Sequence, residues 1–186
     1  MAGWLIIPAI LLFVKGLTTF APAPDYASEA FVGLGIGVSF MVPVDGVFLI
    51  NIGYKEKISN HTYMQYKCGY FNRIKPINKY DFEKHKYAEN YKYKYNSSFF
   101  AFAGPGLEVD LNPFETRACI GLGAILSTKK QMDSSFPQLN EDVYIGIKDK
   151  ENNSIGFQYE HMSNADIKLP NYSRNFILTR VGRKWR

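Results

Sequence analysis

Cysteine is scarce in this sequence, and long apolar runs are absent. Only Cys68 and Cys119 occur among the 186 residues. Two cysteines are too few for a disulfide-stabilised scaffold, and they show no metal-ligand spacing. No apolar run approaches the roughly 20 residues that a membrane-spanning helix needs. These absences exclude a disulfide-rich secreted domain and a helical membrane protein.

The composition is that of a single folded domain. Hydrophobic residues make up 46% of the chain, aromatic residues 16% and charged residues 21%. This apolar fraction is too high for a disordered chain, and the length suits one domain. The 13 tyrosines and 14 phenylalanines, with 15 glycines that interrupt the apolar stretches, argue against a helical bundle.

The N-terminal region has the polarity of a secretion signal. Residues 5–14 are apolar over a length that fits a signal-peptide core rather than a membrane span. Small residues follow, and Ser28-Glu29-Ala30 fits a cleavage site. We therefore predict a signal peptide over residues 1–30 and an exported domain over residues 31–186. The segment before residue 5 has no Lys or Arg, so a short buried or interfacial helix stays open as the alternative.

The remaining chain alternates with a period of two. In residues 31–42, Val32 and Leu34 share one face, and Gly33 and Gly35 share the other. A soluble sheet would carry charged and larger polar side chains on its second face. Aliphatic residues opposite small ones are typical of a narrow barrel that faces lipid. The alternation recurs at residues 48–55, 64–70, 106–111, 118–126, 143–148, 155–160 and 177–185. We predict an all-β fold, an eight-stranded antiparallel transmembrane β-barrel.

The predicted connections also alternate in length, apart from a tight first turn. The short ones are residues 58–60, 112–115 and 151–153. The long ones are residues 72–98, 129–140 and 164–174. This asymmetry is typical of outer-membrane barrels with both termini in the periplasm. A secreted lipocalin-like barrel is the soluble alternative, and its aliphatic face would point inward. In the membrane interpretation Cys68 faces outward and Cys119 inward, so no disulfide is expected.

The third connection combines basic and aromatic residues. It contains seven Lys or Arg against three Asp or Glu, with five interleaved tyrosines. Such a mixture can bind nucleic acid, but a single loop without a binding-fold signature predicts no nucleic-acid partner. Tyrosines at a membrane interface explain it better. On an outer leaflet of phosphorylated glycolipid, the basic residues would attract phosphate groups.

One segment, residues 156–171, has side chains that could perform chemistry. His161 and Ser163 lie two positions apart on a predicted strand, so both project from one face. The alternation places that face toward lipid, where a polar pair is costly unless it serves a function. A histidine activates a serine hydroxyl by accepting its proton, and a third group orients the imidazole. The pair alone is a weak signal, because a strand end with satisfied polar groups has the same sequence.

The longer stretch carries a family resemblance. Residues 161–165 (HMSNA), followed by PN at residues 170–171, resemble the signature of the bacterial lipid A 3-O-deacylases. These are eight-stranded outer-membrane barrels that hydrolyse an ester-linked acyl chain of lipopolysaccharide. The resemblance implies that Ser163 is the nucleophile, His161 the general base and Asn164 part of the oxyanion hole. It also implies lipid A as the substrate, the bacterial outer membrane as the location, and no metal or cofactor.

The sequence departs from the family at the third member of the triad. The family's acid lies 14 residues after the histidine, where this chain has Asn175. An asparagine can orient a histidine but cannot stabilise the imidazolium as a carboxylate does, and such a change can cost about 10⁴ in rate. Glu160 is expected inside the barrel and Asp166 in a loop.

Two functions therefore stay open. The first is a lipid A deacylase-like esterase with Ser163, His161 and Asn175 as the candidate triad. The second is a catalytically inactive barrel that acts as a structural subunit or binds a protein partner, a second copy of the chain included.

Overall fold

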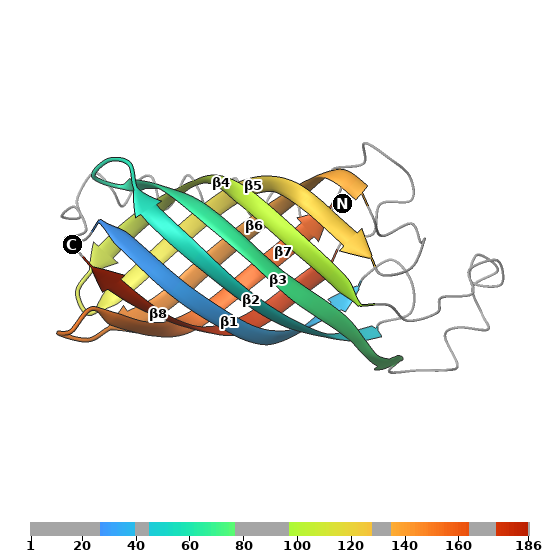
Figure 1. Ribbon diagram of the computed structural model, residues 1–186. Coiled ribbons are helices and arrows are strands. Elements are labelled where there is room, and N and C mark those ends of the chain that lie inside the picture. Colours follow the sequence, from blue (N-terminus) through green and yellow to red (C-terminus); the bar gives the residue numbers. More distant parts are fainter. Residues whose placement is uncertain (1–26, 40–44, 77–96, 128–134, 164–173, 186) are drawn as a thin grey trace, which may run out of the picture.

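The computed structural model describes residues 27–39, 45–76, 97–127, 135–163 and 174–185, which form a closed antiparallel barrel (Figure 1). Its strands are β1 (Ser28–Ser39), β2 (Asp45–Lys57), β3 (Thr62–Pro76), β4 (Ser98–Leu111), β5 (Phe114–Ser127), β6 (Ser135–Lys148), β7 (Asn153–Ser163) and β8 (Arg174–Trp185). Each strand pairs with the next, and β8 pairs with β1. The predicted fold class is confirmed.

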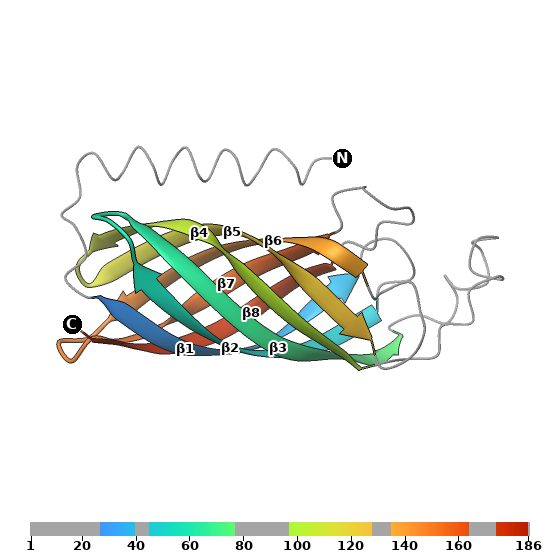
Figure 2. The same cartoon turned by 45° about the horizontal axis from the view of Figure 1, so that its top comes forward.

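The strands run obliquely around the barrel (Figure 2) and contain 11 to 15 residues. A tilted strand needs about 9–11 residues to cross a bilayer. The short connections, residues 58–61, 112–113 and 149–152, join strands at one end of the barrel. Residues 77–97, 128–134 and 164–173 join them at the other end. The predicted length asymmetry is present.

Every strand begins earlier than the alternating segment that indicated it, and for two strands the difference bears on a prediction. Strand β1 starts at Ser28, so the residues of the expected cleavage site pair with β2 and β8. Strand β6 starts at Ser135, within the predicted fifth connection. The alternation there was hidden because Gln138, Asn140 and Asp142 are polar yet point into the barrel. Residues 1–26 of the predicted signal peptide or short helix lie outside the described residues, as does most of the third connection.

The outer wall of the barrel is apolar. Leu34, Ile36 and Phe157 are more than half exposed, at 51%, 66% and 68%. In a lipocalin-like barrel these side chains would fill the interior, so the soluble alternative is wrong. Small residues face inward where strands approach closely. A Cβ on Gly35 would lie 2.7 Å from Leu178 Cα, a separation that real structures do not show.

The end of the interior next to the short connections is filled by charged side chains, which we call the ionic cluster. Its members are Glu29, Lys55, Glu108, Glu115, Arg117, Arg180 and Lys184, all at most 3% exposed. Glu29 on β1 stands opposite Lys55 on β2 and Lys184 on β8. Arg117 Nη2 lies 2.8 Å from both Glu29 Oε2 and Glu115 Oε1. Burial of so many charges is tolerable because each has partners of opposite sign.

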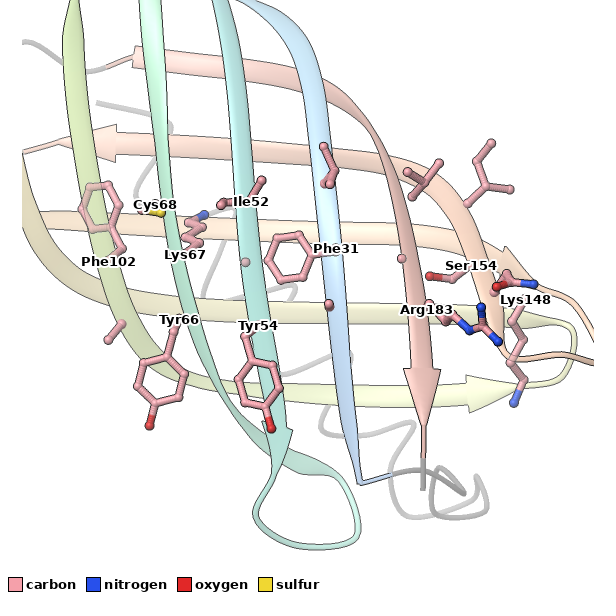
Figure 3. Close-up of a pocket in the computed structure, with 18 of the residues that line it drawn as sticks. Phe31, Ile52, Tyr54, Tyr66, Lys67, Cys68, Phe102, Lys148, Ser154 and Arg183 are labelled. Atoms are coloured by element: carbon pink, nitrogen blue, oxygen red, sulfur yellow. The ribbon is translucent and has the colours of Figure 1, made fainter.

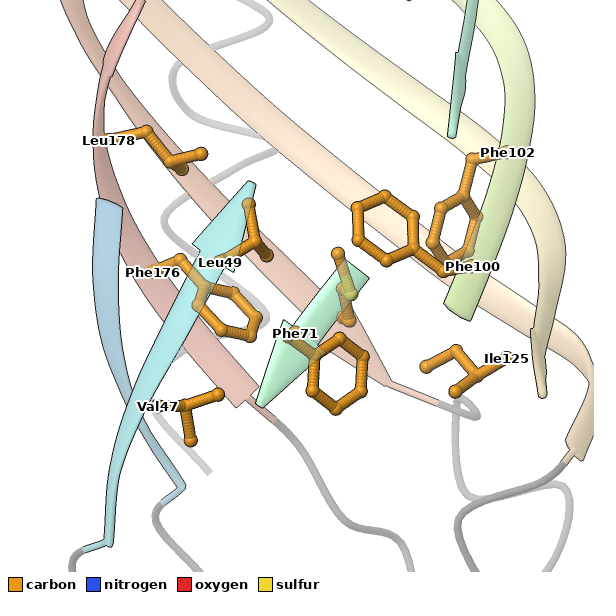
Figure 4. Close-up of a cluster of buried hydrophobic side chains, with 9 residues drawn as sticks. Val47, Leu49, Phe71, Phe100, Phe102, Ile125, Phe176 and Leu178 are labelled. Carbon is orange, nitrogen blue, oxygen red and sulfur yellow. The ribbon is translucent and has the colours of Figure 1, made fainter. Parts of the chain in front are cut away.

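The opposite end of the interior holds buried hydrophobic side chains, which we call the apolar cluster (Figure 4). Its members are Val47, Leu49, Phe71, Phe100, Phe102, Ile125, Met162, Phe176 and Leu178. The rings of Phe71 and Phe100 have centroids 6.2 Å apart, and Phe71 lies 6.0 Å from Phe176. The barrel therefore has a packed interior along its length, with a polar half and an apolar half.

Aromatic side chains gather on the outer wall near the short connections. Tyr54 and Tyr66 are directly opposite each other on β2 and β3, and Figure 3 shows them side by side. The Tyr54 ring centroid lies 6.2 Å from that of Trp185. Such rings are typical of the membrane–water boundary. Cys68 is exposed and Cys119 buried, and both are free, as predicted. No helix among the described residues is long and apolar enough to cross a membrane.

Candidate active site

His161 and Ser163 lie near the end of β7, on the side of the long connections. Phe157, in the same phase of the strand, is exposed on the outer wall. The alternate residues Glu160 and Met162 are buried in the interior, at 0% exposure. The backbone therefore directs His161 and Ser163 to one outer face, as the period of two predicted.

The structure brings His161 and Asn175 together. The two residues are directly opposite each other on β7 and β8, and His161 Nδ1 lies 2.9 Å from Asn175 Oδ1. Because an amide oxygen only accepts hydrogen bonds, Nδ1 carries the hydrogen. The other ring nitrogen, Nε2, then keeps its lone pair and can accept a proton. Asn175 thus selects the tautomer that a general base requires.

Tyr159 is a third member of this outer-face arrangement. Its hydroxyl donates a hydrogen bond to the same Asn175 Oδ1. With two donors on one oxygen, the amide of Asn175 is held in a single orientation. Sequence reasoning missed this role of Tyr159, although its position two residues before His161 in the same phase was a usable signal.

Ser163 Oγ is buried and has no hydrogen-bond partner among the described residues. Ser163 is 1% exposed, and the structure gives no hydrogen bond from it to His161. Buried hydroxyls are normally satisfied, so an unsatisfied one calls for a functional explanation. Nucleophile–base hydrogen bonds are often loose without substrate, so the absence of this bond does not exclude the pair.

The acids around the site differ from the expectation in one respect. Glu160 points into the barrel as predicted, and its Oε1 lies 3.0 Å from Lys67 Nζ. Asn164 and Asp166 lie outside the described residues. Sequence reasoning missed Glu141 on β6, which stands directly opposite His161. The missed signal was its even spacing from Val143, which places Glu141 on the outer face.

A groove on the outer wall lies beside the His161–Asn175 pair. It is lined by Leu34, Gly35, Ile36, Phe48, Phe157, Ile177, Leu178 and Thr179. Ile177 follows Asn175 by two residues, and Phe157 precedes His161 by four. The groove therefore lies on the lipid-facing wall near the polar pair, although neither His161 nor Asn175 is among its lining residues. No group of three or more His, Cys, Asp or Glu residues that could hold a metal ion occurs in the part of the chain that the structure describes.

The lipid-facing wall, the closed eight-stranded sheet and the connection lengths define a bacterial outer-membrane β-barrel. The sequence model of the lipid A 3-O-deacylase (PagL) family matches residues 60–184, about two thirds of the chain. This range contains β3 to β7, all of β8 but its last residue, and the site. The chain belongs to that family. No curated protein matches the sequence.

Solved outer-membrane barrels share the fold. The outer-membrane enzyme PagL is 14% identical, with a TM-score of 0.50 over 83% of this chain and 99% of that chain. Ail, the attachment invasion locus protein of Yersinia pestis, is 13% identical, with a TM-score of 0.53 over 86% and 98% of the two chains. Neisserial surface protein A is 12% identical, with a TM-score of 0.52 over 88% and 99%. At these identities the likeness is one of fold, and it agrees with a location in the bacterial outer membrane.

Proposed function

We propose that this chain is a lipid A deacylase-like esterase that hydrolyses an ester-linked acyl chain of lipopolysaccharide at the outer leaflet. Ser163 is the nucleophile and His161 the general base. The observation that carries the proposal is the hydrogen bond from His161 Nδ1 to Asn175 Oδ1, on the same outer face as the unsatisfied Ser163 hydroxyl. Membership of the lipid A 3-O-deacylase family supports it.

The mechanism has two steps of acyl transfer. Ser163 Oγ attacks the ester carbonyl carbon while His161 Nε2 accepts the hydroxyl proton. The tetrahedral oxyanion is stabilised by hydrogen-bond donors, a role that we assign to Asn164. His161 returns the proton to the leaving alcohol, and an acyl-Ser163 ester remains. A water molecule, deprotonated by His161, then releases the fatty acid and regenerates the serine.

The groove beside the site suits a fatty acyl chain. Its lining is mostly apolar, and it lies near the polar pair on the wall that would face lipid tails. An acyl chain bound there keeps its ester carbonyl at the level of His161 and Ser163. The phosphorylated sugars of the same lipid would then lie toward the long connections. This arrangement lets a lipid react without leaving the membrane.

The test is mass spectrometry of lipid A from Gram-negative cells that express the folded protein. We expect loss of one ester-linked acyl chain with the wild type and no loss with Ser163→Ala. Thr116→Ala, on another outer-facing strand position, is the control for substitution on the lipid-facing wall. Equal lipid A profiles for the wild type and Ser163→Ala would overturn the proposal.

The amide at position 175 favours the second candidate, an inactive barrel with a structural or partner-binding role, in which a homodimer is one form. Under that candidate, Asn175→Glu would be the variant closest to an active family member. If the wild type and Asn175→Glu are both folded and both leave lipid A intact, the inactive barrel replaces the esterase.

A further inference from the structure

Glu141 faces His161 from the side opposite to Asn175. In the register of β6 and β7, Glu141 pairs directly with His161, and on the other edge of β7 His161 pairs with Asn175. The neighbours of Glu141 in chain order, Asn140 and Asp142, bond inside the barrel. Glu141 is therefore on the outer face, where residues directly opposite have Cβ atoms about 4.5–5.5 Å apart.

The position of Glu141 allows its charge to act on His161. The two residues are directly opposite each other, and Glu141 is only 7% exposed, so bulk water would screen an interaction between them weakly. An acidic side chain on a membrane-facing wall is unfavourable unless it serves a purpose. Among the described residues on the outer face of β6, β7 and β8, no other Asp or Glu lies within two residues of His161 along the strand or across the sheet.

We propose that Glu141 is a positioning residue that supplies the negative charge absent from position 175. The inference rests on the proposed esterase function of Ser163 and His161. In a catalytic triad the acid orients the histidine and also stabilises its charged form. Here two residues on different strands, Asn175 on β8 and Glu141 on β6, each perform one of these tasks. Asn175 fixes the tautomer of His161 by a hydrogen bond, and Glu141 stabilises the imidazolium that forms when Nε2 accepts the Ser163 proton. Glu141 stays ionised throughout and neither gains nor loses a proton.

If the two tasks are divided in this way, the effects on kcat of substitutions at Glu141 and Asn175 should not be additive. Glu141→Gln should lower kcat for lipid A deacylation at least tenfold, with KM changed less than twofold, because the charge acts after substrate is bound. Glu141→Asp should keep most of the activity. Asn175→Glu should restore the loss in the Glu141→Gln protein by at least tenfold, but should change the wild type by less than threefold, since Glu141 already provides the charge there.

The measurement uses full-length protein in detergent micelles with purified lipid A. Each rate is divided by the fraction of folded barrel, which is found from the heat-dependent band shift in denaturing gels. Glu56→Gln, an exposed carboxylate on β2 far from the site, is the matched control and should leave kcat unchanged. If Glu141→Gln keeps full kcat while Ser163→Ala is inactive, the role of Glu141 is refuted and the esterase stands. If Ser163→Ala is as active as the wild type, the esterase proposal fails, and that of Glu141 with it.

Discussion

At the short-connection end of the barrel, charged side chains fill the interior, whereas at the long-connection end hydrophobic side chains fill it. The candidate site lies on the outer wall at the second end, and Met162 and Phe176 of the apolar cluster are the chain neighbours of His161 and Asn175. Their other chain neighbours, Glu160 and Arg174, are buried and charged, so both kinds of side chain lie behind the polar pair. The ionic cluster itself lies at the opposite end of the interior.

The two ends also differ in how they respond to change. In the ionic cluster each charge depends on several partners, so loss of one leaves the others buried and uncompensated. In the apolar cluster a side chain of similar volume can replace another at low cost. We therefore expect stability to depend most on the ionic end, and activity to depend on the apolar end.

The largest expected effect is on activity. His161→Ala removes the proposed general base, so we expect lipid A deacylation to fall at least about 10³-fold. The free energy of unfolding should change by less than about 1 kcal/mol, because the side chain lies on the outer wall. Lipid A mass spectrometry and urea unfolding of the folded barrel measure the two quantities. A large loss of stability with little loss of activity would contradict the expectation that this end of the barrel determines activity rather than stability.

Arg117→Met should produce the largest loss of stability. Arg117 contacts Glu29, Glu108 and Glu115 in the ionic cluster. Its removal leaves these carboxylates short of a cation, which costs about 3–5 kcal/mol for a buried pair. Arg183→Met, at an exposed position of β8, is the control and should cost less than about 0.5 kcal/mol. Urea unfolding decides between them, and equal costs would show that the ionic cluster adds nothing to stability.

The N-terminal boundary is a further test of the ionic end. Glu29 Oε2 lies 3.1 Å from Lys55 Nζ, and Glu29 Oε1 lies 3.1 Å from Arg180 Nη2. A cut after Ala30, as the sequence analysis predicted, would remove Glu29. We propose instead a cut before Ser28, which intact mass of the membrane-inserted protein would show.

A matched pair of refolded chains tests the same point energetically. A chain of residues 31–186 should be less stable than one of residues 28–186 by about 3 kcal/mol, because buried cations lose a carboxylate. Equal stability of the two chains, with a mass that begins at Phe31, would restore the boundary at Ala30.

Phe100→Leu should have a smaller effect, because it changes the shape of the apolar cluster but leaves no charge without a partner. We expect a cost of about 1 kcal/mol, as for other swaps between hydrophobic residues of similar volume. Phe114→Leu, on an exposed residue at the start of β5, is the control and should be near neutral. If Phe100→Leu costs as much as Arg117→Met, the two ends do not differ in tolerance.

The sequence predicted the barrel and the His161–Asn175 pair because both follow from a period of two. Once Tyr159 and Ile177 define the outer face, the register of adjacent strands brings the two side chains together. The same rule does not reach Glu141, because the apolar alternation of its strand begins only at Val143. Polar side chains that point into a barrel look like loop residues in a sequence.

The ionic cluster was beyond sequence reasoning for a different reason. Its contacts join residues 88 and 151 positions apart, from Arg117 and Arg180 to Glu29. A charged residue near a chain end is expected at the surface, and no local pattern reveals a partner across the barrel. Glu29 Oε1 and Arg180 Nη2 come within 3.1 Å of each other only because the sheet closes, with β1 paired to β8.

The smallest effect that we predict concerns the short connection between β6 and β7. Asp149 accepts hydrogen bonds from the Asn153 side chain, from the Asn153 backbone N–H and from the Glu151 backbone N–H, each at 2.8 Å. The bonds from Asn153 are the main cause that lowers the pKa of the Asp149 carboxyl below its ordinary value. A carboxyl whose pKa is lower in the folded state stabilises the fold at neutral pH, and this contribution is lost as pH falls through the folded-state pKa. Asp149→Asn should therefore lower the unfolding midpoint slightly at pH 7, and the difference from wild type should vanish once the pH is below the folded-state pKa of Asp149. Glu151→Gln removes an equal charge from the same connection and should keep the wild-type pH dependence. A constant difference between Asp149→Asn and wild type from pH 7 to pH 2 would show that the carboxylate charge does not stabilise this turn.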